Sequence, residues 1–161
     1  MGEPRKVLFL CTGNACRSQM AEAILRHLGG EEFEAHSAGS HPAGFVHELA
    51  IEAMRNLNIP MDETRHVSKS WDEFADDPVE VVITVCDAAA GEACPIWPGD
   101  PLRAHWPLPD PAFHLGSDGA RLNLALSVAQ RLVTKIQGLI ELDWSQDREE
   151  ITGRLKFLGE I

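Results

Sequence analysis

The sequence predicts an α/β domain built on a parallel β-sheet. Short runs of apolar and β-branched residues, typical of buried strands, alternate with longer segments whose apolar residues recur every three or four positions, typical of helices. Strands joined by helical crossovers lie parallel in one sheet. The chain has 161 residues, which suffices for one such domain and is too short for two of ordinary size. We therefore expect a single domain over residues 1–161.

The first half of the chain starts with a strand and a helix. An uninterrupted apolar run over residues 7–10 predicts a buried strand, and helical periodicity follows over residues 17–28. Residues 33–37 predict a second short strand. An apolar stripe over residues 49–57 predicts a helix, which must end before Pro60 because proline disfavours the helical conformation of the residue before it.

The second half contains one clear strand and one clear helix. Residues 79–85 are nearly all apolar or β-branched and predict a strand. A stripe of apolar residues predicts the buried face of a long helix over 119–142: Leu122, Leu126, Ala129, Val133, Ile136 and Ile140. The weaker predictions are a short helix near residues 71–75, a long loop over 87–118 with a short strand near 104–106, and a packed terminal helix within 145–161.

A cysteine follows the first strand and opens a glycine-containing turn into the first helix. The turn reads Cys11, Thr12, Gly13, Asn14, Ala15, Cys16, Arg17 and Ser18. Backbone N–H groups of such a turn and the positive end of a helix attract a tetrahedral anion, and an arginine can bind it through two parallel hydrogen bonds. The same field lowers a thiol pKa. We therefore predict that residues 12–18 bind an oxyanion and that Cys11 is a nucleophilic thiolate at neutral pH.

The overall charge and hydropathy exclude several classes of function. The chain has 14 Lys plus Arg against 25 Asp plus Glu, a net charge of −11, which opposes nonspecific binding to nucleic acid or anionic membranes. An anionic substrate must then be captured by a local positive field. No stretch approaches the roughly 20 apolar residues of a membrane span, and the charged start shows no secretory signal. We expect a cytoplasmic protein.

The four cysteines indicate redox or catalytic use. Without a secretion signal, we do not expect permanent disulfides among Cys11, Cys16, Cys86 and Cys94. No C-x2-C pair supports a zinc site, so we expect no metal. Ligand sites of parallel sheets lie beyond the carboxyl ends of the strands. If the strands that precede Cys11 and Cys86 are neighbours, both thiols face one crevice. Cys16 is expected to be buried and inert.

Several motifs, taken in their order and spacing, resemble one family. They are CTGNACRSQMAE at residues 11–22, SAG at 37–39, VITVC at 82–86, CP at 94–95, HW at 105–106 and DPA at 110–112. The chain resembles arsenate reductases built on the low-molecular-weight tyrosine phosphatase fold, the kind usually reduced by thioredoxin. The resemblance runs over about residues 5–140 and implies a four-stranded parallel sheet flanked by helices.

The resemblance implies a reaction and a role for each site residue. Cys11 would attack arsenate held by Arg17 and the loop amides, and Asp110 would act as general acid. Cys86 and Cys94 would then complete a relay of thiols that releases arsenite. No tightly bound cofactor is implied, because the electrons come from thioredoxin or from glutaredoxin with glutathione. The seven residues between Cys86 and Cys94, a longer spacing than in the best-known thioredoxin-coupled members, leave the reductant open.

Two alternative functions and one ion are also considered. A protein tyrosine phosphatase would need the same cradle, but such relatives usually place an aromatic residue after Asp-Pro, where this chain has Ala112. A noncatalytic redox sensor would not need the cradle or the acid.

Some family members bind a monovalent cation beside the loop at positions matching Asn14, Glu22 and Ser37. Because His66 stands where a further acidic ligand is expected, we predict no such ion.

Overall fold

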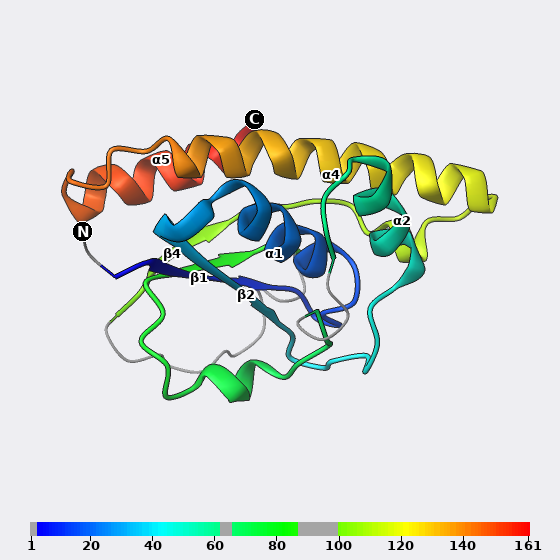
Figure 1. The fold of residues 1–161 in the computed structure, drawn as a ribbon, viewed down its shortest axis with the longest axis horizontal. Helices are drawn as coiled ribbons and strands as arrows, with labels where there is room; N and C mark the ends of the chain where they lie inside the picture. Colours follow the sequence, from blue (N-terminus) through cyan, green and yellow to red (C-terminus); the bar gives the residue numbers. More distant parts are fainter. Residues whose placement is uncertain (1–2, 62–65, 87–99) are drawn as a thin grey trace.

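The computed structural model describes residues 3–61, 66–86 and 100–161. Its centre is a four-stranded, fully parallel sheet with the strand order β2-β1-β3-β4. The strands are β1 (Arg5–Leu10), β2 (Phe33–Ala38), β3 (Val81–Thr84) and β4 (Leu102–His105). The α/β class and the four-stranded parallel sheet flanked by helices are thereby confirmed (Figure 1).

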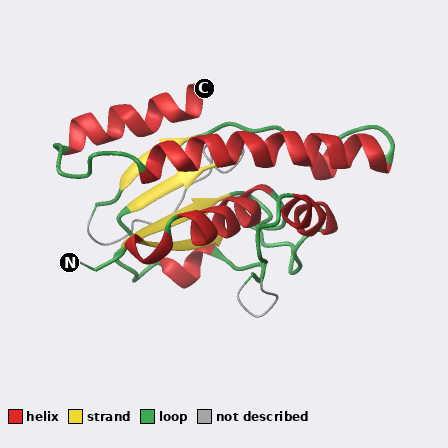
Figure 2. Ribbon diagram, turned by 45° about the horizontal axis from the view of Figure 1, so that its top comes forward, coloured by secondary structure: helices red, strands yellow, loops and turns green. Residues whose placement is uncertain are grey.

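Helices pack mainly on one face of this sheet. The helices are α1 (Arg17–Leu28), α2 (Glu48–Asn56), α4 (Asp118–Ile140) and α5 (Arg148–Glu160), with short 3-10 turns η1 (Gly30–Glu32), η2 (Trp71–Phe74) and η3 (Pro111–Phe113). Figure 1 shows α1 and α4 on one side of the sheet and η2 on the other, and Figure 2 shows α4 and α5 running side by side. Within the described residues, none of these helices is long and apolar enough to span a bilayer.

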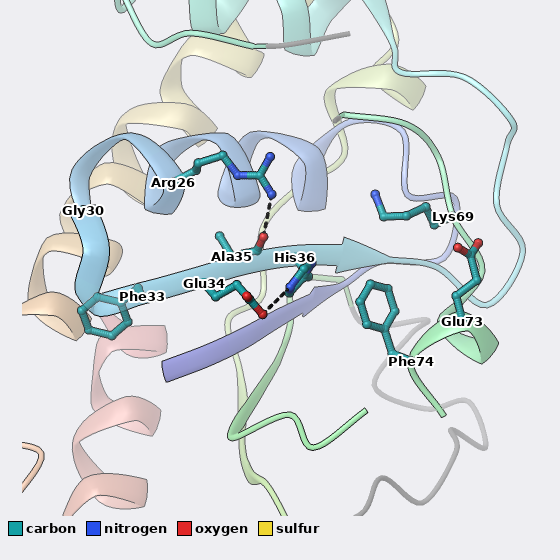
Figure 3. A pocket seen from close by; sticks show the side chains of 9 residues that line it. All are labelled: Arg26, Gly30, Phe33, Glu34, Ala35, His36, Lys69, Glu73 and Phe74. Carbon is teal, nitrogen blue, oxygen red and sulfur yellow. Dashed lines mark hydrogen bonds and ion pairs between the residues drawn. The ribbon is translucent and has the colours of Figure 1, made fainter. Parts of the chain in front are cut away.

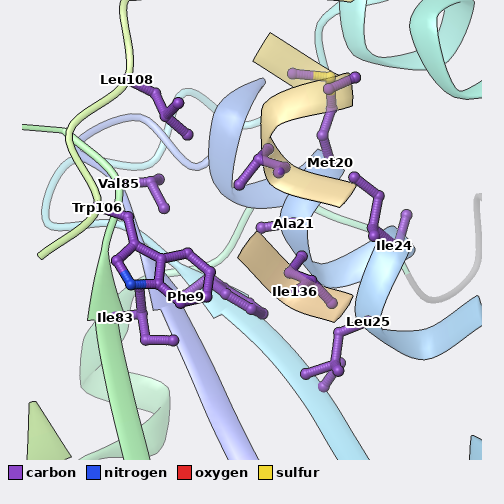
Figure 4. Close-up of a cluster of buried hydrophobic side chains, with 14 of the residues drawn as sticks. Phe9, Met20, Ala21, Ile24, Leu25, Ile83, Val85, Trp106, Leu108 and Ile136 are labelled. Atoms are coloured by element: carbon purple, nitrogen blue, oxygen red, sulfur yellow. The ribbon is translucent and has the colours of Figure 1, made fainter. Parts of the chain in front are cut away.

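The two faces of the sheet carry two hydrophobic cores. Side chains alternate along a strand, so Phe9 of β1 faces α1 and α4 while Leu8 faces η2. On the helix side, Phe9 packs against Trp106 with ring centroids 6.1 Å apart, and Ile136 of α4 covers them (Figure 4). The Trp106 indole N–H donates to the Leu155 carbonyl at 2.9 Å, which satisfies a polar group in this core.

The predicted buried face of the long helix was partly wrong. Ala129 and Ile136 are fully buried, as expected, but the other predicted residues are only partly buried along the border of the core. The deepest positions of α4 include Ala125, Leu132 and Leu139. Because α4 carries apolar residues on more than one side, its periodicity alone does not show which side the sheet covers.

The outer edge of β2 is protected by charged side chains. Arg26 of α1 reaches over this edge and donates to the Ala35 carbonyl at 2.8 Å, and His36 lies 2.9 Å from Glu34. Figure 3 shows these residues around an open cavity of about 610 Å³. Charges on an edge strand prevent pairing with a second chain. Protection of the edge therefore accounts for the charged residues around this cavity.

Candidate active site

Cys11 and Cys86 lie next to each other, as the strand order requires. Strands β1 and β3 are paired with Leu10 opposite Thr84, so Cys11 and Cys86 emerge at the carboxyl ends of neighbouring strands. Both are buried, with 5% and 3% of their surface exposed, and Cys86 has the largest effect of any residue on the pKa of Cys11. The Thr12 hydroxyl lies 3.6 Å from the Cys86 sulfur. The two strands are therefore neighbours, as the prediction required, although only Cys11 of the two thiols lines the pocket described below.

The surroundings of Cys11 differ from the sequence expectation in one respect. Its pKa is raised, first by the hydrogen bond to Cys86 and then by burial, while the guanidinium of Arg17 acts in the opposite direction. Cys86 and burial therefore oppose ionisation of Cys11, whereas Arg17 favours it.

Asn14 holds the nucleophile loop in shape. Its backbone φ of 46° is in the left-handed region, which asparagine tolerates better than most residues. The side-chain amide donates to the Ser18 hydroxyl at 2.9 Å, and its oxygen accepts from the Gln19 amide at 3.0 Å and from the Lys69 N–H at 2.8 Å. Helix α1 is preceded by Cys16 and has no side-chain cap, so Ser18 serves the loop through Asn14.

The loop is also fixed from a second side by backbone hydrogen bonds. The carbonyls of Thr12, Gly13 and Ala15 accept from backbone N–H groups of the segment that leads to α2, at 2.8 to 2.9 Å. In a trans peptide the C=O and N–H groups point in opposite directions. The N–H groups of these same peptides therefore point away from that segment, as an anion cradle needs.

A pocket of about 330 Å³ opens above the loop. Arg17 and Asp110 line it together, with Arg17 Nη2 3.1 Å from Asp110 Oδ2. Arg17 also donates to the Leu108 carbonyl at 2.9 Å, and the second Asp110 oxygen accepts from the Ala112 N–H at 3.0 Å. The structure thus brings the predicted nucleophile, arginine and acid into one pocket.

Five residues that line the pocket were missed by the sequence reasoning: His41, Ala43, Phe45, His47 and Phe113. Phe113 comes one position after Ala112, and both phenylalanines are exposed, at 84% and 56% for Phe113 and Phe45. The signal in the sequence that could have revealed aromatic surface at the pocket was Phe113, two positions after the Asp-Pro motif. Aromatic surface is therefore present at the mouth, although Ala112 occupies the position where it was expected.

Of the two remaining cysteines, the structure describes Cys16 and not Cys94. Cys16 lines the pocket but is buried, and burial raises its pKa to about 12, which keeps it protonated at neutral pH as expected of an inert thiol. Cys94, the predicted third thiol of the relay, lies outside the described residues.

The surroundings of Glu22 do not fit a monovalent cation. Its carboxylate is 1% exposed and accepts from the Ser37 hydroxyl at 2.7 Å. His66 Nε2 and Arg26 Nη2 each lie 3.3 Å from it, and Lys69 Nζ lies 3.8 Å away. Groups that carry or can carry positive charge already surround this carboxylate, so a metal cation beside it would be repelled.

The fold and the site define a class of protein. A thiol at the carboxyl end of a parallel strand, followed by an anion loop with arginine and faced by an aspartate, is the arrangement of a phosphatase-like nucleophile. Residues 6–143 match the model of the low molecular weight phosphotyrosine protein phosphatase family, and the chain belongs to this family.

Its relatives within the family narrow the class to arsenate reductases. The arsenate reductase of Staphylococcus xylosus is 37% identical over 127 residues, which cover 79% of this chain and 94% of the relative. A solved arsenate reductase in the phosphate binding state is similar with a TM-score of 0.65 and 30% identity, over 84% of this chain and 96% of that one. The thioredoxin-dependent arsenate reductase of Corynebacterium glutamicum is similar with a TM-score of 0.59 and 29% identity, over 84% and 63%.

Proposed function

We propose that this protein reduces arsenate to arsenite. The observation that carries the proposal is that Cys11 and Cys86 follow neighbouring strands and lie buried together beside the anion loop. A phosphatase needs one thiol at this position, whereas a reductase needs a second thiol that can attack the first. The arsenate reductases among the relatives support the same activity.

The first step of the proposed reaction forms a bond between sulfur and arsenic. Arsenate lies on the loop N–H groups and the Arg17 guanidinium, which stabilise both its charge and the thiolate of Cys11. Cys11 attacks arsenic, and Asp110 donates a proton to the departing oxygen, which leaves as water. Arsenic remains in its +5 state, bound to Cys11.

The second step transfers two electrons. The Cys86 thiolate attacks the Cys11 sulfur, and the electron pair of the sulfur–arsenic bond goes to arsenic, which leaves as arsenite in the +3 state. A disulfide between Cys11 and Cys86 remains. Cys94 then attacks Cys86, which frees Cys11 and leaves a disulfide between Cys86 and Cys94. An external dithiol reduces that bond.

We infer that the external dithiol is thioredoxin, because a relative with this fold is thioredoxin-dependent. Glutaredoxin with glutathione is the alternative, since the spacing between Cys86 and Cys94 leaves the reductant open. The cycle also needs a compartment that keeps thiols reduced. This requirement, together with a chain in which no described helix can span a bilayer, supports a cytoplasmic location.

A second candidate, hydrolysis of aryl phosphates, is favoured by one observation. Phe45 and Phe113 line the pocket that contains Cys11, Arg17 and Asp110, and they offer a ring the apolar surface it needs. This activity would use Cys11 and Asp110 but neither of the two relay thiols.

The test is NADPH consumption with arsenate, thioredoxin and thioredoxin reductase. We expect sustained consumption by the native protein and none by Cys86→Ser or Cys11→Ser, with reactions lacking arsenate as controls. Cys86→Ser should still hydrolyse an aryl phosphate, whereas Cys11→Ser should not. If neither thioredoxin nor glutaredoxin with glutathione supported consumption while an aryl phosphate was hydrolysed well, the phosphatase would replace the reductase as the function.

A further inference from the structure

A short segment behind the nucleophile loop contacts that loop at several points. The Lys69 N–H donates to the Asn14 side-chain oxygen at 2.8 Å, and the Ser68 hydroxyl donates to the Gly13 carbonyl at 3.2 Å. The Val67 carbonyl accepts from the Gln19 amide at 3.0 Å, and the same amide donates to the Asn14 carbonyl at 3.1 Å. Residues 66–69, the supporting segment, therefore bear directly on the backbone and side chain that shape the loop.

The supporting segment is anchored to α1 by a buried carboxylate. His66 and Glu22 are 4% and 1% exposed, and His66 Nε2 lies 3.3 Å from Glu22 Oε2. The Lys69 ammonium, 3.8 Å from the other Glu22 oxygen, also donates to the Val67 carbonyl at 2.8 Å. A buried carboxylate is costly unless nearby groups compensate its charge, so Glu22 draws both ends of the segment onto the helix.

We propose that Glu22 and His66 are positioning residues for the anion loop, and that His66 together with Lys69 and Arg26 does for Glu22 what an external cation would otherwise do. This inference rests on the proposed function for the identity of the anion. Neither residue lines the pocket that contains Cys11, so both act through the supporting segment.

The conformation of Asn14 shows why such support is needed. A residue with φ of 46° is held there only when its surroundings determine it, and here the oxygen of its side chain is fixed by Gln19 and by the supporting segment. If the contact between Glu22 and His66 is lost, Lys69 shifts and Asn14 loses one of these two donors. The loop N–H groups then no longer converge on one anion.

Protection of Cys11 by arsenate tests this inference without requiring turnover, provided that every protein compared, the reference protein included, carries Cys86→Ser so that bound arsenate cannot be reduced. Alkylation of Cys11 by iodoacetamide is followed by mass spectrometry, and the arsenate concentration that halves its rate is measured. We expect His66→Leu to raise this concentration by about tenfold, because misplaced donors bind the anion poorly. His66→Gln, which keeps an N–H near the position of Nε2, should restore most of the protection.

A matched control and a second variant keep the result interpretable. His36→Gln changes a histidine that also pairs with a glutamate, at 2.9 Å from Glu34, but at the edge of β2, and it should leave protection unchanged. Thermal unfolding establishes that each variant is folded. If His66→Leu does not fold, Glu22→Gln tests the same contact from the helix and should also raise the half-protecting concentration.

The choice of salt adds a readout that a purely structural role would not move. Groups of the protein already surround Glu22, so the native protein should be protected equally in KCl and in choline chloride of the same ionic strength. Unchanged protection in folded His66→Leu, or a specific need for potassium in the native protein, would overturn the inference. Failure of arsenate to protect native Cys11 at all would instead refute the proposed function.

Discussion

At the scale of single residues, the contact between Cys11 and Cys86 controls when the nucleophile is charged. The hydrogen bond to Cys86 is the largest cause of the raised pKa of Cys11, ahead of burial. The two thiols therefore titrate as a pair, and the arginine beside Cys11 favours its thiolate only as far as Cys86 permits. The same proximity that prepares the disulfide also restrains the first attack.

Replacing Cys86 should make Cys11 easier to ionise. In Cys86→Ala the hydrogen bond is gone while burial and Arg17 remain, so the pKa of Cys11 falls and its thiolate fraction at a fixed neutral pH rises. The pH dependence of iodoacetamide alkylation, measured on the Cys11 peptide with Cys86→Ala placed in a Cys94→Ser background, should move its midpoint downward from that of Cys94→Ser alone. A midpoint that rises would show that Cys86 donates its proton to a Cys11 thiolate.

Site residues carried by a local motif or by a motif of the family, such as Asp110, could be predicted, whereas residues brought in from a distance without a motif could not. Cys11 and Arg17 share one short turn, and the chemistry of this turn can be recognised from the sequence without knowledge of the fold. Phe45 and His47 approach it only because their segment packs above the turn. Nothing in the spacing of such residues encodes the contact, so they appear only once the chain is folded.

At the scale of elements, α5 shows how one glycine fixes a helix against the sheet. A Cβ placed on Gly159 would lie 2.5 Å from the His105 carbonyl oxygen and 2.8 Å from Trp106 Cδ1. The end of α5 therefore approaches the backbone after β4 as closely as only glycine allows. The predicted packed terminal helix is confirmed, with Ile151, Leu155 and Leu158 buried as expected, although no periodicity could reveal this close approach.

Two glycines of α5 should respond in opposite ways to the same substitution. Gly159→Ala introduces the clash described above and should lower the free energy of unfolding by about 1–3 kcal/mol. Gly153→Ala, where a Cβ meets nothing within 4 Å, should raise it by up to about 1 kcal/mol through helix propensity. Urea unfolding measures both changes. Equal effects of the two substitutions would contradict the packing of α5 against β4.

At the scale of the whole molecule, the sheet and the long helices depend on the larger of the two cores. Trp106 packs against β1 on one side and donates to α5 on the other, so the sheet and the terminal helix share a buried side chain. Lys135 of α4 donates to the carbonyls of Leu158, Gly159 and Ile161 at 2.8 to 3.2 Å and joins the two long helices. The family match ends at residue 143, yet α5 lies beyond that point and covers the same core.

The chain should therefore unfold as one cooperative unit. A single unfolding transition is what the predicted single domain implies. Urea transitions followed by far-UV circular dichroism and by tryptophan fluorescence should have the same midpoint, because Trp106 lies in the larger core and Trp71 in the smaller one. An earlier transition in circular dichroism alone would show that α5 separates from a domain that ends near residue 143.

The ion pair of Arg17 and Asp110 has a consequence for selectivity. An incoming oxyanion must compete with a carboxylate already 3.1 Å from the guanidinium, so a singly charged anion gains little by exchange, and a doubly charged tetrahedral one gains more. This competition rejects weakly charged anions but treats phosphate and arsenate alike. The protein therefore distinguishes arsenate from phosphate only at the electron-transfer step, because arsenic can accept the electron pair of its bond to sulfur and phosphorus cannot. Phosphate in the surroundings therefore competes for the loop at all times, and its concentration determines how much arsenate the protein can bind.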